Sequence, residues 1–137
     1  MTPTETPEQA AIAKYIAEHG KGATHVENSL YILKKTPGTG KAVIDGDNVE
    51  VRYKGMFLDG RVFDQSADHG GPGTFSFEYS PDVPLIQGWI KIIGNMHEGE
   101  KVSVLIPSWL AYGQRGAGGL IPANTPLLFD IEVVKLN

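Results

Sequence analysis

The sequence predicts an α+β protein in which a mainly antiparallel sheet packs on one short, buried helix. Two observations lead to this prediction. The segment 84–93 is apolar on almost every side, so a helix there must be covered over most of its surface. Most of the chain after residue 28 has the pattern of strands joined by hairpin turns, and these strands could supply the cover. A length of 137 residues fits one domain with its own core.

Composition and charge disfavour several classes of protein. Hydrophobic residues make up 41% and charged residues 20% of the chain, which is typical of a soluble globular protein rather than a disordered one. The net charge of −4 disfavours nucleic acid and anionic membranes as partners. Because the chain has no cysteine, disulfides and thiolate chemistry are excluded. No signal peptide is visible, so the cytoplasm is the default compartment, and a trimmed chain would leave the periplasm open.

The first predicted element is an amphipathic helix over Pro7–His19. Thr6 is a typical N-cap residue, and Gln9, three positions later, completes a capping box. Proline suits the first helical position because its missing N–H has no partner there in any case. Gly20 ends the helix.

This helix divides the chain into two parts. We expect residues 1–24 to form an N-terminal extension and residues 25–137 to form the main domain, with a linker over 21–28. The helix is expected to pack on the domain or on a second copy of the chain. The chain is therefore expected to be a monomer or a weak dimer that associates through this helix.

Alternation of apolar and polar residues predicts the strands. Val49, Val51 and Tyr53 fall on one face of the segment 48–57. The dipeptide Asp59-Gly60 then predicts a tight hairpin. The predicted strands are 29–35, 48–57, 61–65, 74–79, 100–106 and 126–136.

The buried helix is predicted over 84–93. Pro84 suits its first position, and Gly94 stands where a left-handed glycine commonly ends a helix. Gly88 inside the helix costs up to about 1 kcal/mol relative to alanine. It is therefore expected to allow either close packing or access to a pocket.

No motif in the chain predicts a metal or cofactor site. The histidines show no ligand spacing, and the glycine-rich segment 113–119 lacks the Gly-Lys-Ser/Thr ending of a phosphate loop. A Gly-x-Ser-x-Gly elbow is also absent. Aromatic residues on separate predicted elements remain, and they form either plain core or the wall of a pocket. They are Tyr53, Phe63, Phe75, Phe77, Trp89, Tyr112 and Phe129.

Three groups of motifs carry a family resemblance. The first is Val51-Arg-Tyr-Lys-Gly55 followed by Leu58-Asp-Gly-Arg-Val-Phe-Asp64-Gln-Ser66, and the second is Leu85-Ile-Gln-Gly-Trp89. The third comprises Ala111-Tyr-Gly113, Leu120-Ile-Pro122 and Leu128-Phe-Asp130. In this order they resemble the FKBP family of peptidyl-prolyl cis–trans isomerases. The resemblance runs from residue 29 to residue 136.

The resemblance implies a curved antiparallel sheet of about five strands wrapped around the short helix. It also implies an enzyme that accelerates rotation about Xaa-Pro bonds in protein chains and so assists folding. Its partners would be proline-containing polypeptides and macrolide inhibitors of the FK-506 and rapamycin type, and no cofactor is implied.

The resemblance further implies a role for each residue of the pocket. Trp89 would form the floor, and Asp64 would form a polar wall beside Tyr53. The backbone N–H of Ile86 and the hydroxyl of Tyr112 would donate to substrate carbonyls. The implied catalytic residues are Tyr53, Phe63, Asp64, Ile86, Trp89, Tyr112 and Phe129. The implied substrate-binding residues are Phe75, Leu85, Leu120 and Ile121.

Two other classes of function stay open from the sequence. One is a non-catalytic module that binds proline peptides or acts as a chaperone. The other is a structural subunit of an oligomer, which rests only on the helix over Pro7–His19. Ala117 and Leu110 stand where the family frequently has histidine and tyrosine, and their effect on ligand affinity is left open.

Overall fold

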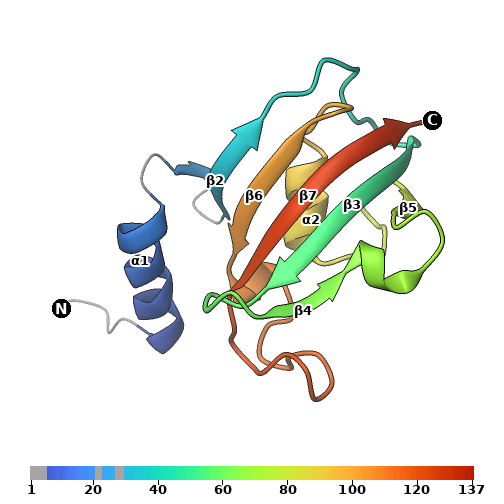
Figure 1. Ribbon diagram of the computed structural model, residues 1–137. Coiled ribbons are helices and arrows are strands. Elements are labelled where there is room, and N and C mark those ends of the chain that lie inside the picture. The colour runs from blue at the N-terminus through green and yellow to red at the C-terminus, as the bar shows by residue number, and fades with distance from the viewer. Residues whose placement is uncertain (1–5, 21–22, 27–29) are drawn as a thin grey trace.

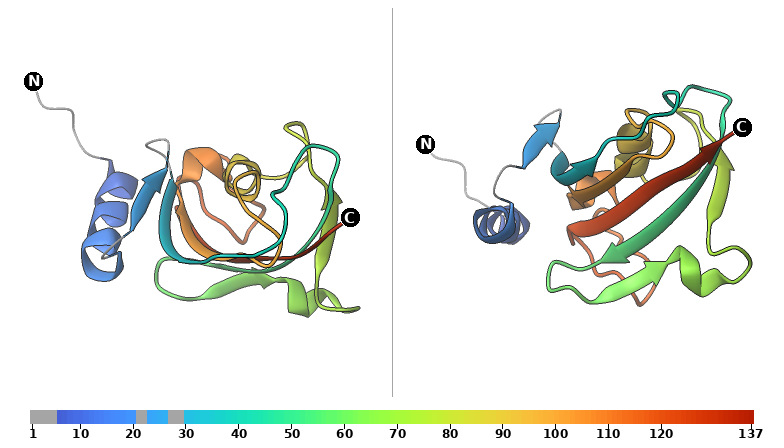
Figure 2. Two further views of the ribbon diagram at one scale, coloured as in Figure 1. Left: turned by 90° about the horizontal axis from the view of Figure 1, so that it is seen from above. Right: turned by 45° about the horizontal axis from the view of Figure 1, so that its top comes forward.

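The computed structural model describes residues 6–20, 23–26 and 30–137. Within these residues, seven strands form one antiparallel sheet, and the sheet curves around a short helix (Figures 1 and 2). The helices are α1, Pro7–His19, and α2, Gln87–Ile93. The strands are β1, Thr24–Val26; β2, Leu30–Thr36; β3, Asn48–Met56; β4, Val62–Gln65; β5, Phe75–Glu78; β6, Lys101–Ile106; and β7, Leu127–Leu136. The predicted α+β class is confirmed, and the sheet holds more strands than the five or so expected.

The strand order is β1-β2-β6-β7-β3-β4, and β5 also pairs with β3. β7 runs along one edge of β3 from Val49 to Met56, while β4 and β5 share the other edge at opposite ends. The chain between β4 and β5 therefore leaves the sheet beside the middle of β3. A 3₁₀ helix, Ser66–His69, fills part of this connection.

The core lies between the concave face of the sheet and α2. Val49 and Val51 of β3 are fully buried, as the predicted alternation requires. In β7 the buried positions change from odd to even numbers before Leu136. The reason is a bulge, because Val49 pairs with Leu136 whereas Val51 pairs with Val133, so β7 carries one extra residue there.

The predicted limits of α2 are wrong at its N-terminal end. The segment 83–85 is a bend, Ile86 is the N-cap with φ −61° and ψ 145°, and the helix begins only at Gln87. Pro84 therefore does not occupy the first helical position. A bend of this kind has no periodic signal in the sequence.

Gly88 within α2 and Gly94 at its C-cap are required by packing rather than by backbone conformation. A Cβ on Gly88 would lie 2.5 Å from Cγ2 of Ile106, so this glycine lets α2 approach β6 closely. Gly94 has φ −62°, so it is not the left-handed residue that was predicted. A Cβ there would collide with the hydroxyl of Tyr79, which donates to the carbonyl of Ile90 at 2.9 Å.

The N-terminal helix has its predicted bounds and its capping box of Thr6 and Gln9. It lies outside the sheet at one end (Figure 1). Ile12 is buried there against Leu105 and Leu128, which point away from α2. β1 falls within the predicted linker, since a strand of three residues is too short to show alternation. Neither helix in the described ranges is long and apolar enough to cross a membrane.

Candidate functional site

A cavity of about 470 Å³ opens between the concave face of the sheet and the N-terminal end of α2. Its lining comes from β3, β4, β5, β7, α2 and the segment that follows β6. It contains nine of the eleven residues that the sequence proposed for the site. They are Tyr53, Phe63, Asp64, Phe75, Leu85, Ile86, Trp89, Tyr112 and Phe129.

Trp89 lies at the centre of the aromatic part of this cavity and is only 5% exposed. Its ring meets Tyr53 at a centroid distance of 5.0 Å and Phe129 at 5.6 Å, both edge to face. Phe75 lies 6.3 Å from Trp89 and Phe63 lies 5.7 Å from Phe129. These edge-to-face contacts are favourable for aromatic pairs, and they hold each ring in a fixed orientation.

Gly55 of β3 makes room for two of these rings. A Cβ at this position would lie 2.6 Å from Cζ of Phe63 and 2.8 Å from Cε1 of Phe129. Since its φ is not in the left-handed region, the glycine is needed for space rather than for backbone freedom. Gly55 therefore belongs to the architecture of the cavity although it is not among the lining residues.

A bulge brings two consecutive residues of β4 to the same site. Gly55 pairs with Asp64 and Met56 pairs with Val62, so Phe63 is the extra residue of β4. In a regular strand, Phe63 and Asp64 would point to opposite faces. The bulge breaks this alternation and lets both side chains line the cavity.

The polar wall of the cavity is built on Asp64. Its carboxylate accepts a hydrogen bond from the hydroxyl of Tyr53 at 2.9 Å, and its other oxygen lies 2.6 Å from Nε2 of His69. Burial and the contact with Asp64 raise the pKa of Tyr53 to about 12. Burial and the charge of Asp64 also raise the pKa of Tyr112. Both phenols are therefore protonated donors at neutral pH.

Three N–H or O–H donors of the cavity have no partner among the described residues. The backbone N–H of Ile86, at the N-cap of α2, makes no backbone hydrogen bond there. The hydroxyl of Tyr112 likewise has no hydrogen-bond partner in the described ranges. The indole N–H of Trp89 is buried and unpaired. Of the three, only the indole N–H of Trp89 is buried, and a buried donor without a partner is costly, so a bound molecule that offers an acceptor there would be favoured.

Leu120 and Ile121 lie outside this cavity. Ala117 and Ile121 exchange backbone hydrogen bonds, which closes the chain into a tight turn. Leu120 is 56% exposed and lines a separate groove beside Leu58, whereas Ile121 is buried in the core. The family resemblance of the motif Leu120-Ile-Pro122 did not indicate which of these two side chains would point into the core and which to the surface.

Sequence reasoning missed some residues of the site. His69 was not predicted to belong to the site, yet it contacts Asp64 from the glycine-rich connection between β4 and β5. Gln87 and Ala111 also line the cavity. Only the spacing of five residues between Asp64 and His69 could have suggested that contact, and such spacing has no fixed geometry in a loop.

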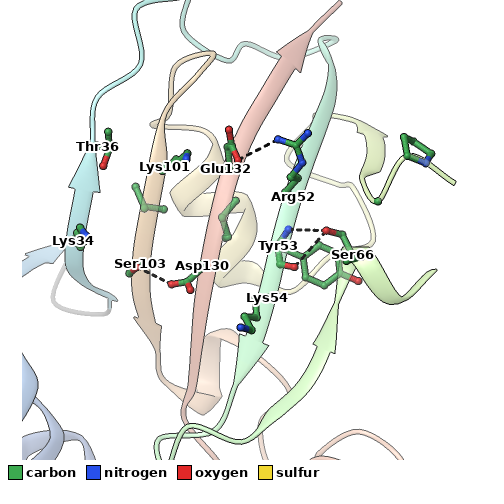
Figure 3. Close-up of a pocket in the computed structure, with 15 residues that line it drawn as sticks. Lys34, Thr36, Arg52, Tyr53, Lys54, Ser66, Lys101, Ser103, Asp130 and Glu132 are labelled. Atoms are coloured by element: carbon green, nitrogen blue, oxygen red, sulfur yellow. Dashed lines mark hydrogen bonds and ion pairs between the residues drawn. The ribbon is translucent and has the colours of Figure 1, made fainter. Parts of the chain in front are cut away.

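A larger cavity of about 530 Å³ lies on the outer face of the sheet (Figure 3). It is lined mainly by exposed polar and charged side chains that pair across neighbouring strands. Ser103 donates to Asp130 at 2.7 Å, and Arg52 lies 3.4 Å from Glu132 (Figure 3). Exposed pairs of this kind contribute little energy. Of the predicted site residues only Tyr53 contributes to this lining, so we place the functional site in the aromatic cavity.

The described residues contain no group of three or more histidine, aspartate or glutamate side chains that could hold a metal ion. The aromatic cavity offers apolar walls and a few oriented donors. Such a site can bind an apolar ring and fix the polar groups beside it.

Comparisons with known proteins agree with this geometry. The family model described as FKBP-type peptidyl-prolyl cis-trans isomerase matches residues 40–134. The FKBP-type 22 kDa peptidyl-prolyl cis-trans isomerase of Escherichia coli is 37% identical over 125 residues, which are 90% of this chain and 58% of that protein. FK506-binding protein 1 of Candida glabrata is 40% identical over 82% of this chain and 96% of its own length.

A solved structure matches the whole architecture. The crystal structure of a peptidyl-prolyl cis-trans isomerase from Pseudomonas syringae has a TM-score of 0.76 and 34% identity, and the match covers 98% of this chain and 99% of that one. The chain spans only 44–58% of the length of four bacterial relatives that it matches, the Escherichia coli protein among them. The extent of the family match, together with the aromatic cavity at α2, establishes that the chain belongs to the FKBP-type peptidyl-prolyl cis–trans isomerase family.

Proposed function

We propose that this domain is a peptidyl-prolyl cis–trans isomerase that accelerates rotation about Xaa-Pro bonds in protein chains. The observation that carries the proposal is the cavity at the N-terminal end of α2, where aromatic rings surround Trp89 and polar donors lie at the rim. Its dimensions and lining suit an apolar ring flanked by carbonyl groups. We assign the activity to residues 25–137 and treat residues 1–24 as an extension.

The reaction needs no bond to be broken. Resonance gives the peptide bond a rotational barrier of roughly 18–20 kcal/mol, while the cis and trans forms of an Xaa-Pro bond differ by only about 0.5–1 kcal/mol. A catalyst must therefore bind the twisted amide more tightly than the planar one. Twisting removes resonance and lowers the charge on the carbonyl oxygen. An apolar pocket favours the twisted amide because it solvates the more polar planar form poorly.

The chain's own groups supply this preference. Trp89 and the rings of Tyr53 and Phe129 would hold the proline ring, and Phe63 would complete the wall. The N–H of Ile86 would bind one of the flanking carbonyls. Each tenfold increase in rate requires about 1.4 kcal/mol of preference for the twisted state, so several modest contacts suffice.

At the rim, Tyr112 would donate its hydroxyl to another carbonyl of the substrate. Its raised pKa keeps the phenol protonated for this role. Asp64 would orient Tyr53 through their hydrogen bond. Phe75 and Leu85 would extend the apolar lining toward the residues on either side of the proline.

The same pocket is proposed to take macrolides of the FK-506 and rapamycin type. Such molecules present an apolar ring next to carbonyl groups, which is the pattern that the pocket would recognise in a proline peptide. A competition experiment between peptide and macrolide tests whether the two share the site.

The decisive experiment is an isomerisation assay on an Xaa-Pro peptide with two variants. Phe75→Ala removes a ring that is 37% exposed, so activity should fall with little loss of stability. Lys101→Ala, on the outer face, is the matched control and should leave the rate unchanged. Unchanged activity in Phe75→Ala together with reduced activity in Lys101→Ala would contradict this choice of cavity.

The alternative function is a non-catalytic module that binds proline peptides or acts as a chaperone, and the similarity to proteins named as isomerases does not favour it. It shares the pocket and differs only in the absence of rate acceleration. Peptide binding to the wild-type chain without any acceleration would favour this alternative.

A further inference from the structure

The N-terminal helix makes a polar contact with the domain that the proposed chemistry does not use. The carboxylate of Glu8, in the first turn of α1, accepts hydrogen bonds from both the backbone N–H and the hydroxyl of Ser108. The two distances are 2.6 and 2.5 Å, and Ser108 is only 4% exposed. Short hydrogen bonds to a carboxylate in a part-buried position are among the stronger polar contacts in proteins.

Ser108 in turn fixes the backbone around Tyr112. Its carbonyl accepts hydrogen bonds from the N–H of Ala111 at 2.9 Å and of Gly113 at 2.8 Å, the residues on either side of Tyr112. The hydroxyl of Tyr112 makes no hydrogen bond within the described ranges, so its position depends on this backbone. Glu8 therefore fixes the position of Ser108, and Ser108 in turn fixes the backbone on both sides of Tyr112.

Glu8 is itself held in a defined place. Its helix is capped by Thr6, and one turn further on Ile12 is buried against Leu105 and Leu128. Leu105 precedes Ser108 by three residues on the same stretch of chain. α1 therefore contacts β6 through the apolar side chain of Ile12 and contacts the segment after β6 through the carboxylate of Glu8. The two contacts hold Leu105 and Ser108, which lie on either side of the end of β6.

We propose that Glu8 is a positioning residue, and that α1 braces the segment 108–113 so that the hydroxyl of Tyr112 faces the pocket. The inference rests on the proposed role of Tyr112 in substrate binding. Without the brace, the segment samples other conformations, and the apparent affinity for substrate falls in proportion to the competent fraction. The N-terminal helix then serves the site of its own chain.

The test compares three single variants of the full chain well below their melting temperatures. Glu8→Ala removes the carboxylate, and Glu8→Asp keeps a charge at the helix N-terminus but is one methylene too short to reach Ser108. Glu18→Ala removes a carboxylate that is 54% exposed at the other end of the same helix. We expect KM for an Xaa-Pro peptide to rise roughly 3- to 10-fold in both Glu8 variants, the factor expected from a net hydrogen-bond contribution, with kcat within about twofold. Glu18→Ala should match the wild type.

Repeating the Glu8→Ala substitution in a Tyr112→Phe protein distinguishes an effect on the position of Tyr112 from a general loss of stability. In Tyr112→Phe the hydroxyl is absent, so adding Glu8→Ala should raise KM no further. Exchange of the Gly113 amide should be faster in Glu8→Ala than in the wild type, because the turn on Ser108 is loosened. A lower melting temperature with unchanged KM, or an equal rise of KM in both backgrounds, would overturn the inference. If Tyr112→Phe alone leaves kcat/KM unchanged, the proposed role of Tyr112 fails, whereas a loss in Tyr112→Phe with none in Glu8→Ala refutes only the brace.

Discussion

Gly55→Ala tests whether the positions of the pocket rings matter for activity, because it displaces two of them without removing any polar group of the pocket. The change adds one methyl group on β3 and removes no hydrogen bond. Its Cβ would lie 2.6 Å from Phe63 and 2.8 Å from Phe129, whereas ordinary contact begins at 3.4 Å. Both rings therefore have to move toward the cavity that they enclose.

The expected magnitude follows from two opposing effects. Overpacking a well-filled site costs about 1–3 kcal/mol. Replacing glycine inside a strand by alanine regains about 0.5–1 kcal/mol of backbone entropy. We expect a net loss of about 1–2 kcal/mol in the free energy of unfolding, or about 3–8 °C in melting temperature for a domain of this size. Because small displacements of positioning groups are costly in rate, kcat/KM should fall about tenfold.

The assay combines urea unfolding with isomerisation of an Xaa-Pro peptide at low temperature, where the variant is fully folded. Gly119→Ala is the matched control, since a Cβ there meets nothing within 4 Å and its φ is not in the left-handed region. It should behave like the wild type in both measurements. Loss of stability in Gly55→Ala with unchanged kcat/KM would refute the assignment of Phe63 and Phe129 to the active pocket.

Three further predictions concern individual pocket residues. Trp89→Ala should lower activity sharply and also destabilise the fold by about 3–5 kcal/mol, because the side chain belongs to both core and pocket; a folded variant with wild-type activity would place the site elsewhere. Asp64→Ala should weaken macrolide binding about tenfold in a calorimetric titration, with little change in melting temperature, because its side chain is 37% exposed; equal losses of binding and stability would indicate a purely structural residue. The folded pKa of Tyr53, about 12, lies above its ordinary value of 10, so its contribution to stability is complete below pH 10 and is lost as the pH rises toward 12. Unfolding free energies should therefore fall more steeply from pH 10 to 12 in the wild type than in Tyr53→Phe, and parallel profiles would contradict the assignment.

Periodicity and turn signals were sufficient to predict most of the fold. Alternation placed Val49 and Val51 in the core, and the capping box of Thr6 gave the bounds of α1 correctly. These features depend on interactions between residues close in sequence. The turn at Asp59-Gly60 is equally local, with Gly60 at φ +92°.

Features that depend on contacts between distant residues could not be read from the sequence. The bulge at Phe63 depends on pairing with β3, and the role of Gly94 depends on the hydroxyl of Tyr79. The contact of Glu8 with Ser108 joins residues 100 positions apart, and no spacing rule predicts it.

We propose that Xaa-Pro rotation is accelerated in the aromatic cavity around Trp89. Exchange NMR on an Xaa-Pro peptide, with the protein titrated by a rapamycin-type macrolide, tests it most directly. We expect cis–trans exchange to be fast with the protein alone and to return to the uncatalysed rate near one equivalent of macrolide. The indole N–H signal of Trp89 should shift as macrolide is added, in proportion to the loss of accelerated exchange. The signal of the exposed Trp109 should not shift. Accelerated exchange that persists at saturating macrolide would show that rotation is accelerated outside this cavity.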